Sequence, residues 1–199
     1  MRIEAELSQL LLIDWQPRLI PALFEGPAAV ANAQRLAQAA QRLRVPTWGT
    51  EQNPDKLGPL VPELRGLCRD TLNKMSFSAV DDGLVPWLMP KPSGNAKSMP
   101  KHLRANSPAT EPTKPQLIVS GCEAHVCVMQ TALDLLEEEH WQVWIVTDAC
   151  SSRTERNRDA AWDRLASAGA ELVTTEMVLF EWLRSAEHPE FKAIQGLIR

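Results

Sequence analysis

The chain has 199 residues, of which 44% are hydrophobic and 23% are charged. This length fits one compact domain with a sizeable core and leaves little room for a second domain. The formal net charge is −4, and neither a polybasic arm nor a basic amphipathic helix occurs. These features argue against a nucleic-acid or membrane partner and favour a small-molecule substrate.

The first apolar run, LLLID, is about as long as a strand, and no charged leader with a small-residue cleavage site precedes it. No segment approaches the length of a transmembrane helix. We therefore expect a cytoplasmic protein whose cysteines are reduced thiols rather than disulfides. The chain has four of them, Cys68, Cys122, Cys127 and Cys150.

Strand-length apolar runs alternate with stretches of helical period along the chain. The expected strands cover residues 9–14, 44–50, 115–121, 141–149 and 170–175, and the expected helices cover 28–43, 125–139 and 155–169. Strand followed by helix, repeated, indicates a parallel sheet whose two faces are covered by helices. The sequence therefore predicts a doubly wound, three-layer α/β/α domain with a mostly parallel six-stranded sheet.

Residues 86–115 break this pattern, because they hold seven of the fifteen prolines and show no clear period. From Lys91 to Arg104 the segment has basic residues and no acidic ones. We interpret it as a long loop or insertion within a single domain spanning residues 1–199. It is either a solvated loop or a lid that contacts an anionic group.

Ligands of doubly wound folds bind beyond the carboxyl ends of the strands, so the residues after each apolar run are candidates for chemistry. The stretch GCEAHVCVMQTALDLLEEEH, residues 121–140, holds two cysteines at the start of an expected helix. Cys127 falls in the first helical turn, where free N–H groups and the helix dipole lower a thiol pKa, whereas Cys122 falls in the preceding turn. This favours Cys127 as a nucleophile, although a buried apolar role for it stays open.

Two charged residues could serve that thiol. Asp14 ends the most apolar strand, where it is either a proton acceptor or an ordinary turn or capping residue. Lys74 lies between apolar residues in TLNKMSFSAV, where it is either a functional ammonium or a surface lysine beside a loop. Taken singly, neither residue identifies a site.

Several separated motifs together resemble the isochorismatase-like cysteine hydrolases, and most of all the isochorismatase domain-containing or YcaC-related branch. The resemblance covers nearly the whole chain outside residues 86–115 and rests on LLLIDWQPRLIPAL, TEQNPDKLGPLVPEL, KMSFSAV, GCEAHVCVMQTALDLLEEE, TDACSSRTERNRDAAWDRLASAGAELVTTEMVLFEWL and HPEFKAIQGLIR. It implies a triad in which Asp14 takes the thiol proton, Lys74 balances charge, and Cys127 attacks a carbonyl or nitrile carbon to form an acyl-enzyme. It also implies a homo-oligomer, either a dimer or a larger assembly.

The resemblance further implies a non-proline cis peptide between Cys122 and Glu123, with backbone N–H groups near Ala124 and of Cys127 as an oxyanion hole. In this arrangement Cys122 is structural. Ala124 replaces the Thr of many relatives, which removes one possible hydrogen bond to substrate. His125, beside the nucleophile, is expected to cap the helix or face away.

Nicotinamidases of the same superfamily bind a metal through an Asp and two His residues, but GTEQNPDKLG contains no histidine. We therefore expect neither a metal nor another cofactor. The expected function is a hydrolase of a small amide, carbamoyl or nitrile compound; the alternatives are vinyl ether hydrolysis as in isochorismatase, with Cys127 idle, or a non-catalytic interaction protein. The expected pocket wall comprises Trp15, Gln16, Thr50, Phe77 and Trp87, of which Trp15 and Phe77 could equally be core.

Overall fold

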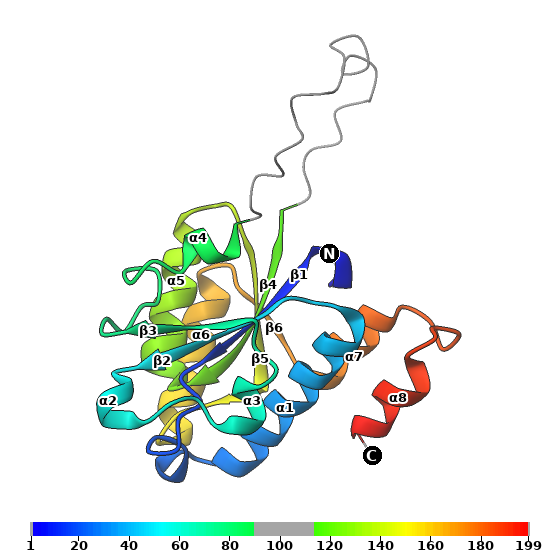
Figure 1. Cartoon of the computed structure of the whole chain (residues 1–199). Helices are drawn as coiled ribbons and strands as arrows, with labels where there is room; N and C mark the ends of the chain where they lie inside the picture. Colours follow the sequence, from blue (N-terminus) through cyan, green and yellow to red (C-terminus); the bar gives the residue numbers. More distant parts are fainter. Residues whose placement is uncertain (1, 90–113, 199) are drawn as a thin grey trace, which may run out of the picture.

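The computed structural model describes residues 2–89 and 114–198, which form an α/β fold (Figure 1). A six-stranded sheet with all neighbours parallel has the order β3-β2-β1-β4-β5-β6. Its strands are β1 (Ser8–Ile13), β2 (Thr47–Gln52), β3 (Asp70–Lys74), β4 (Gln116–Cys122), β5 (Gln142–Ser151) and β6 (Glu171–Val173). The prediction of a doubly wound, three-layer domain is confirmed.

Helices cover both faces of this sheet (Figure 1). One face packs mainly against α1 (Gly26–Leu43), α3 (Pro62–Arg65), α7 (Thr175–Leu183) and α8 (Phe191–Gln195). The other face packs against α4 (Val85–Leu88), α5 (Met129–Glu137), α6 (Glu155–Ser167) and the π-helical turn η4 (Ala124–Val128). Shorter elements are η1 (Ala5–Leu7), η2 (Ile20–Ala22), α2 (Pro54–Leu57) and η5 (Gly196–Ile198).

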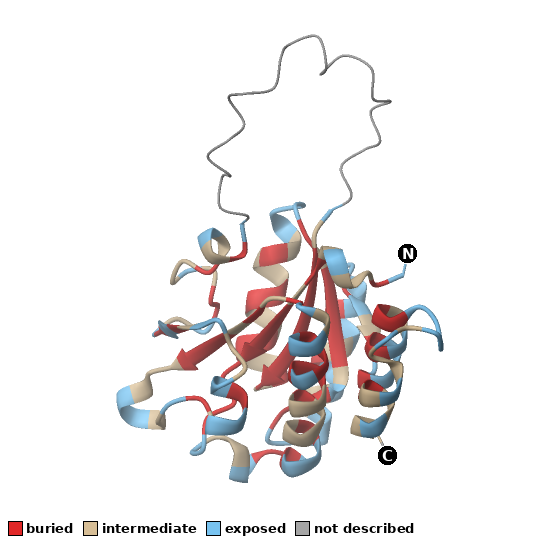
Figure 2. Ribbon diagram, turned by 45° about the vertical axis from the view of Figure 1, so that its right-hand side comes forward, coloured by how far each residue is buried: buried red, intermediate tan, exposed pale blue. Residues whose placement is uncertain are grey.

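The last four residues of β1, LLLI, are apolar and fully buried, and Figure 2 shows that the strands of the sheet consist largely of buried residues. Such a continuous apolar run is typical of a strand covered on both faces. In β1, the Leu10 and Leu12 side chains enter the core beneath α1, whereas Leu11 and Ile13 enter the core beneath α5. Alternate side chains of a strand point to opposite faces, so one run of four apolar residues serves two cores. This explains why the strand was evident from the sequence.

The chain reverses its direction of winding between β1 and β4, which pair in parallel along their whole length. Near the carboxyl end of this pair the strands approach closely at Gly121, where a Cβ atom would lie 2.6 Å from both Cβ and the carbonyl oxygen of Ile13. Glycine is therefore required there. Doubly wound folds bind ligands outside the carboxyl ends of the strands, at a reversal of this kind.

Several parts of the chain differ from the sequence-based expectation, which included none of the helices α2, α3, α7 and α8. Strand β3 is an edge strand with alternating exposed residues, DTLNK, so it lacks the apolar run by which the other strands were recognised. Residues 86–88, expected to begin a long loop, belong to the short helix α4. The rest of that expected loop, from 90 to 113, lies outside the described residues.

Candidate active site

Asp14 follows directly after β1 and has a left-handed backbone conformation, with φ of 52°. Asp tolerates this conformation better than most residues, and it turns the side chain toward the neighbouring strand ends. The Asp14 side chain is fully buried. Its Oδ1 accepts a hydrogen bond of 2.7 Å from the hydroxyl of Thr50, in β2, so Thr50 orients the carboxylate rather than lining an open pocket.

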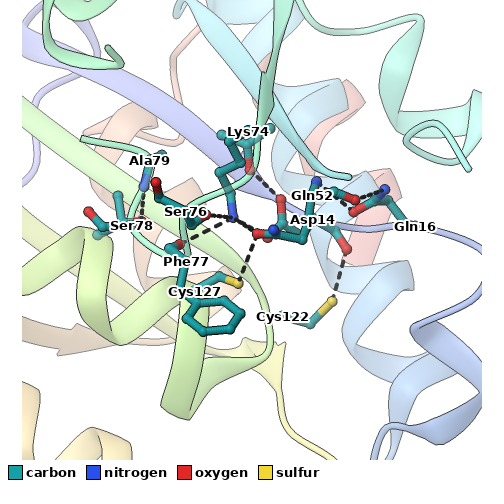
Figure 3. Close-up of polar contacts among 12 residues, drawn as sticks. Asp14, Gln16, Gln52, Lys74, Ser76, Phe77, Ser78, Ala79, Cys122 and Cys127 are labelled. Carbon is teal, nitrogen blue, oxygen red and sulfur yellow. Dashed lines mark hydrogen bonds and ion pairs between the residues drawn. The ribbon is translucent and has the colours of Figure 1, made fainter. Parts of the chain in front are cut away.

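Lys74, the last residue of β3, pairs with this carboxylate. Its Nζ lies 2.8 Å from Asp14 Oδ2, and both side chains are 0% exposed (Figure 3). Oδ2 nevertheless accepts no hydrogen bond of good geometry within residues 2–89 and 114–198. A buried carboxylate oxygen with an unused lone pair is suited to accept a proton from a group other than Lys74.

Cys127 lies in η4, between β4 and α5, and is 6% exposed. The sequence predicted a regular first helical turn here, whereas the structure has a π-helical turn. Figure 3 shows the thiol pointing toward the Asp14 and Lys74 side chains. The structure thus brings together one residue from the end of β1, one from the end of β3 and one from the turn after β4.

The pKa of Cys127 differs from the sequence-based expectation of a lowered value. Burial, and after it the Asp14 carboxylate, raise the pKa of Cys127 to about 12, although Lys74 acts in the opposite direction. The pair of Asp14 and Lys74 therefore faces a protonated Cys127 thiol at rest. Loss of the thiol proton requires a nearby acceptor, and Asp14 is that neighbour.

The other cysteines have different surroundings. Burial raises the pKa of Cys122 well above its ordinary value, and its thiol donates to the Asp14 carbonyl oxygen at 3.0 Å. Burial likewise raises the pKa of Cys68 and Cys150 to about 12. Cys68 also has an acidic and a basic neighbour, Glu51 and Arg65, but the Arg65 side chain is 52% exposed; Cys127 is distinguished by a charged pair that is fully buried and not by its own acidity.

The peptide bond between Cys122 and Glu123 is cis. The Glu123 carbonyl oxygen accepts hydrogen bonds from the backbone N–H groups of Val126 and Val128, at 3.0 and 3.3 Å. The Glu123 side chain forms a 2.6 Å ion pair with Arg153, and hydrogen bonds from Arg153 lower the Glu123 pKa. These contacts hold the turn that precedes Cys127, and the buried Ala124 begins η4.

His125 points toward α6 and not toward the thiol. Its Nδ1 lies 3.0 Å from the Ser152 hydroxyl, and its Nε2 lies 3.3 Å from Asn157 Nδ2. Both ring nitrogens thus have partners on the segment from the end of β5 to the start of α6. This matches the expectation that His125 has a structural position.

The structure separates the residues expected to form the pocket wall. Trp15 and Gln16 are fully buried: Trp15 packs in the core and donates to Ser120 Oγ, and Gln16 bonds to main-chain groups. Trp87 lies at the other end of the sheet, beside a cavity of about 770 Å³ lined by Ser8 and Pro46. Phe77 differs, because its side chain is 55% exposed and its carbonyl oxygen accepts from Lys74 Nζ at 3.2 Å.

Gln52, the last residue of β2, is a site residue that the sequence analysis did not identify. Its Oε1 lies 2.6 Å from Lys74 Nζ and 3.9 Å from Cys127 Sγ. The sequence signal was its place at a strand end in GTEQNPDKLG, where the sequence favoured Thr50 as the pocket residue instead. In the part of the chain that the structure describes, no three or more His, Cys, Asp or Glu side chains are grouped to hold a metal ion.

The fold and this cluster define an α/β protein with a buried carboxylate, an ammonium and a thiol at the switch point of the sheet. Residues 8–177 match the model of the isochorismatase domain, so the chain belongs to the isochorismatase-like hydrolase family. Isochorismatase domain-containing protein 2 of Danio rerio is 39% identical over 99% of this chain and 89% of its own length. The Xenopus laevis protein of that name is 37% identical over 96% of this chain and 83% of its own length.

Solved structures agree with this membership. The MAR1 ribonuclease of Caenorhabditis elegans has a TM-score of 0.78 and 31% identity, covering 100% of this chain and 92% of its own. YcaC of Pseudomonas aeruginosa, described with hexane-2,5-diol and covalent acrylamide, has a TM-score of 0.78 and 29% identity over 98% of this chain and 91% of its own. YcaC of Escherichia coli, described as an octameric hydrolase of unknown specificity, has a TM-score of 0.75 and 27% identity over 100% of this chain and 95% of its own.

No helix within residues 2–89 and 114–198 combines the length and the apolar character needed to cross a membrane.

Proposed function

We propose that the protein is a cysteine hydrolase that cleaves a small amide, carbamoyl or nitrile compound through Asp14, Lys74 and Cys127. The observation that carries this proposal is the buried 2.8 Å pair of Asp14 and Lys74 beside the Cys127 thiol. Isolated charges are costly to bury, so a buried ion pair in contact with a nucleophilic group is a candidate for chemistry. The described donor set offers no metal site, and the proposed reaction uses no metal or other cofactor.

For an amide substrate, the Cys127 thiol proton first passes to Asp14 Oδ2, and the thiolate sulfur then forms a bond with the carbonyl carbon. The carbonyl π electrons move to the oxygen, which backbone N–H groups near Ala124 and of Cys127 would stabilise. When the C–N bond breaks, the leaving nitrogen takes the proton from Asp14. The product is an amine and a thioester on Cys127.

Water then completes the reaction. A water molecule gives a proton to Asp14 as its oxygen attacks the thioester carbon, and the C–S bond breaks. The carboxylic acid leaves, and the sulfur regains a proton from Asp14. Lys74 stays an ammonium throughout, because it balances the negative charge first on Asp14 and then on the sulfur.

The matched test compares two buried cysteines. A panel of amides, ureas and nitriles identifies a compound that the wild type hydrolyses, and Cys127→Ala is expected to slow its turnover by roughly a thousandfold or more. Cys122→Ala removes a thiol of the same kind from the neighbouring strand and is expected to keep turnover. Loss of activity in folded Cys122→Ala with activity retained in Cys127→Ala would contradict the proposal.

Acrylamide offers a test that needs no substrate. A thiolate adds to the terminal carbon of its double bond, and the adjacent carbon takes up a proton. Because the Pseudomonas aeruginosa neighbour is described with covalent acrylamide, we expect a single adduct on Cys127 by peptide mass spectrometry. Preferential labelling of Cys68 or Cys150 would count against an activated Cys127.

The ribonuclease name of the Caenorhabditis elegans neighbour provides one further arm of the panel. A formal net charge of −4 gives this chain little electrostatic attraction for a polyanion, so we expect no cleavage of RNA.

Isochorismate is the other substrate to include in the panel. Hydrolysis of its vinyl ether by Cys127→Ala would support a reaction in which Asp14 is the acid and the thiol takes no part. For assembly, the octameric neighbour supports a homo-oligomer, which light scattering would measure.

A further inference from the structure

The Gln52 side chain contacts both Lys74 Nζ and Cys127 Sγ through the same atom, Oε1. The distance to Nζ is 2.6 Å, shorter than the distances from Nζ to Asp14 Oδ2 and to the Phe77 carbonyl oxygen, 2.8 and 3.2 Å. An ammonium has three donors and no acceptor. Gln52 therefore makes the shortest of these contacts with the Lys74 ammonium.

The orientation of this amide follows from its partners. Gln52 Nε2 donates to the Met75 carbonyl oxygen at 2.8 Å, while Oε1 accepts from Lys74. The flipped amide would place its NH₂ group against an ammonium and its oxygen against a carbonyl, which are two repulsive contacts. The oxygen of Gln52 is thereby held toward the lysine and the thiol.

The main chain of Gln52 is held as well. The Gln16 side chain accepts from the Gln52 backbone N–H at 2.9 Å and donates to the Gln52 carbonyl oxygen at 3.0 Å. Gln16 Nε2 also donates to the Gly58 carbonyl oxygen at 2.6 Å. This fully buried glutamine thus fixes the end of β2 from which the Gln52 side chain reaches the site (Figure 3).

We propose that Gln52 is a positioning residue that holds the Lys74 ammonium between Asp14 and Cys127 while negative charge moves from the carboxylate to the sulfur. This inference rests on the proposed function. Before proton transfer the charges lie on Asp14 and Lys74, and after it they lie on the sulfur and Lys74. The neutral amide keeps its bond to the ammonium in both states, so the ammonium does not have to find a new position during the reaction.

Two substitutions of Gln52 separate its electrostatic role from its packing. Gln52→Glu preserves the shape and adds a negative charge next to the thiol, so less thiolate forms and alkylation of Cys127 at a fixed, mildly alkaline pH should slow by about three- to tenfold. Gln52→Met keeps a side chain of similar length but removes the amide oxygen. In the wild type this oxygen faces the sulfur and competes with it for the Lys74 ammonium. Alkylation of Cys127 should then quicken by roughly two- to fivefold, because Lys74 can turn toward the thiolate.

The measurement is the rate at which iodoacetamide modifies Cys127, followed by peptide mass spectrometry with Cys68 in the same digest as an internal reference. Turnover of the panel compound should fall in both variants. Gln52→Met removes the oxygen that holds the Lys74 ammonium, and Gln52→Glu adds a carboxylate that draws the ammonium away from the sulfur. Gln9→Glu and Gln9→Met are matched controls: Gln9 is also a half-buried glutamine whose amide is hydrogen-bonded, but at the opposite end of the sheet. They should leave the alkylation rate of Cys127 unchanged.

Few charged or titratable groups lie around Cys127 in the described part of the chain. Asp14 faces it from β1 and Lys74 from β3, Cys122 lies near it on β4, and His125 shares its turn. None of these is altered in the Gln52 variants, and thermal unfolding verifies that each variant is folded. Shifts of opposite sign in Gln52→Glu and Gln52→Met support the proposal, whereas shifts of the same sign, or none, overturn it. Alkylation does not depend on hydrolysis, so this outcome stands even if Cys127→Ala retains turnover and the proposed function fails.

Discussion

The two ends of the sheet differ in how they use polar groups. At the carboxyl ends of the strands, Asp14 and Lys74 are fully buried and directed at Cys127. At the amino ends, a cavity of about 770 Å³ is bordered by Trp48 and Trp87, whose rings meet edge to face at 6.1 Å. The amino end therefore has the large cavity, whereas the buried charged pair lies at the carboxyl end. Burial of an ion pair costs desolvation free energy, so its location indicates function more directly than open volume does.

The largest effect on stability should come from breaking the charged pair. Lys74→Met leaves the Asp14 carboxylate buried and unpaired, and Asp14→Asn leaves the Lys74 ammonium buried and unpaired. Each substitution should lower the free energy of unfolding by about 3–5 kcal/mol. The double variant should recover much of this loss, because no unpaired charge is left. Urea unfolding measures all three.

The matched control for that pair is the exposed ion pair of Arg42 and Glu190, at 3.1 Å. Arg42→Met should cost no more than about 1 kcal/mol, since solvent screens both charges. If Lys74→Met lowers the free energy of unfolding as little as Arg42→Met does, the Asp14–Lys74 pair behaves like an exposed ion pair, and the contrast between the two ends of the sheet fails.

A smaller effect is expected at the β1–β4 junction beneath the site. Gly121→Ala places a methyl group 2.6 Å from the Ile13 Cβ and carbonyl oxygen and should cost about 1–3 kcal/mol. Gly196→Ala has no neighbour within 4 Å and should change stability by less than about 0.5 kcal/mol. Equal unfolding midpoints for the two variants would show that β1 and β4 can separate without cost.

The smallest effect on the site should come from the amino end. Trp87→Leu removes the ring that meets Trp48, at a cost of about 0.5–1.5 kcal/mol beyond the lost burial. Because Trp87 borders the opposite end of the sheet, alkylation of Cys127 and the KM of the panel compound should not change. A raised KM in this variant would restore Trp87 as part of the pocket wall, as the sequence suggested.

The sequence predicted the parts of the molecule that follow from local pattern. Strands such as β1 are continuous apolar runs, and Cys127 could be favoured over Cys122 because a turn before a helix is a local feature. Edge strand β3 was missed because its exposed positions break the apolar run. Local pattern is therefore informative where an element is buried on both faces and weak at the edge of the sheet.

The rest of the site depends on which side chains face each other across strands. The raised pKa of Cys127 results from burial and from a carboxylate that is distant in sequence, so neighbouring residues in the sequence could not indicate it. The role of Gln52 likewise depends on Lys74, which reaches it from the adjacent strand. Trp15 shows the converse: it follows a strand end in sequence, yet its indole turns into the core and donates to Ser120.

The pairing of β1 with β4 also has a consequence for the order in which the protein forms. Strands β1, β2 and β3 are contiguous in sequence and carry Asp14, Gln52 and Lys74, whereas Cys127 is synthesised later and arrives with β4. During synthesis, the charged part of the site thus belongs to an early half-sheet and the thiol to a late one. Contacts of long sequence separation form slowly. The environment of Cys127 is consequently a reporter of the docking of these two halves, and a chain that ends before β4 would lack the thiol that faces Asp14 and Lys74.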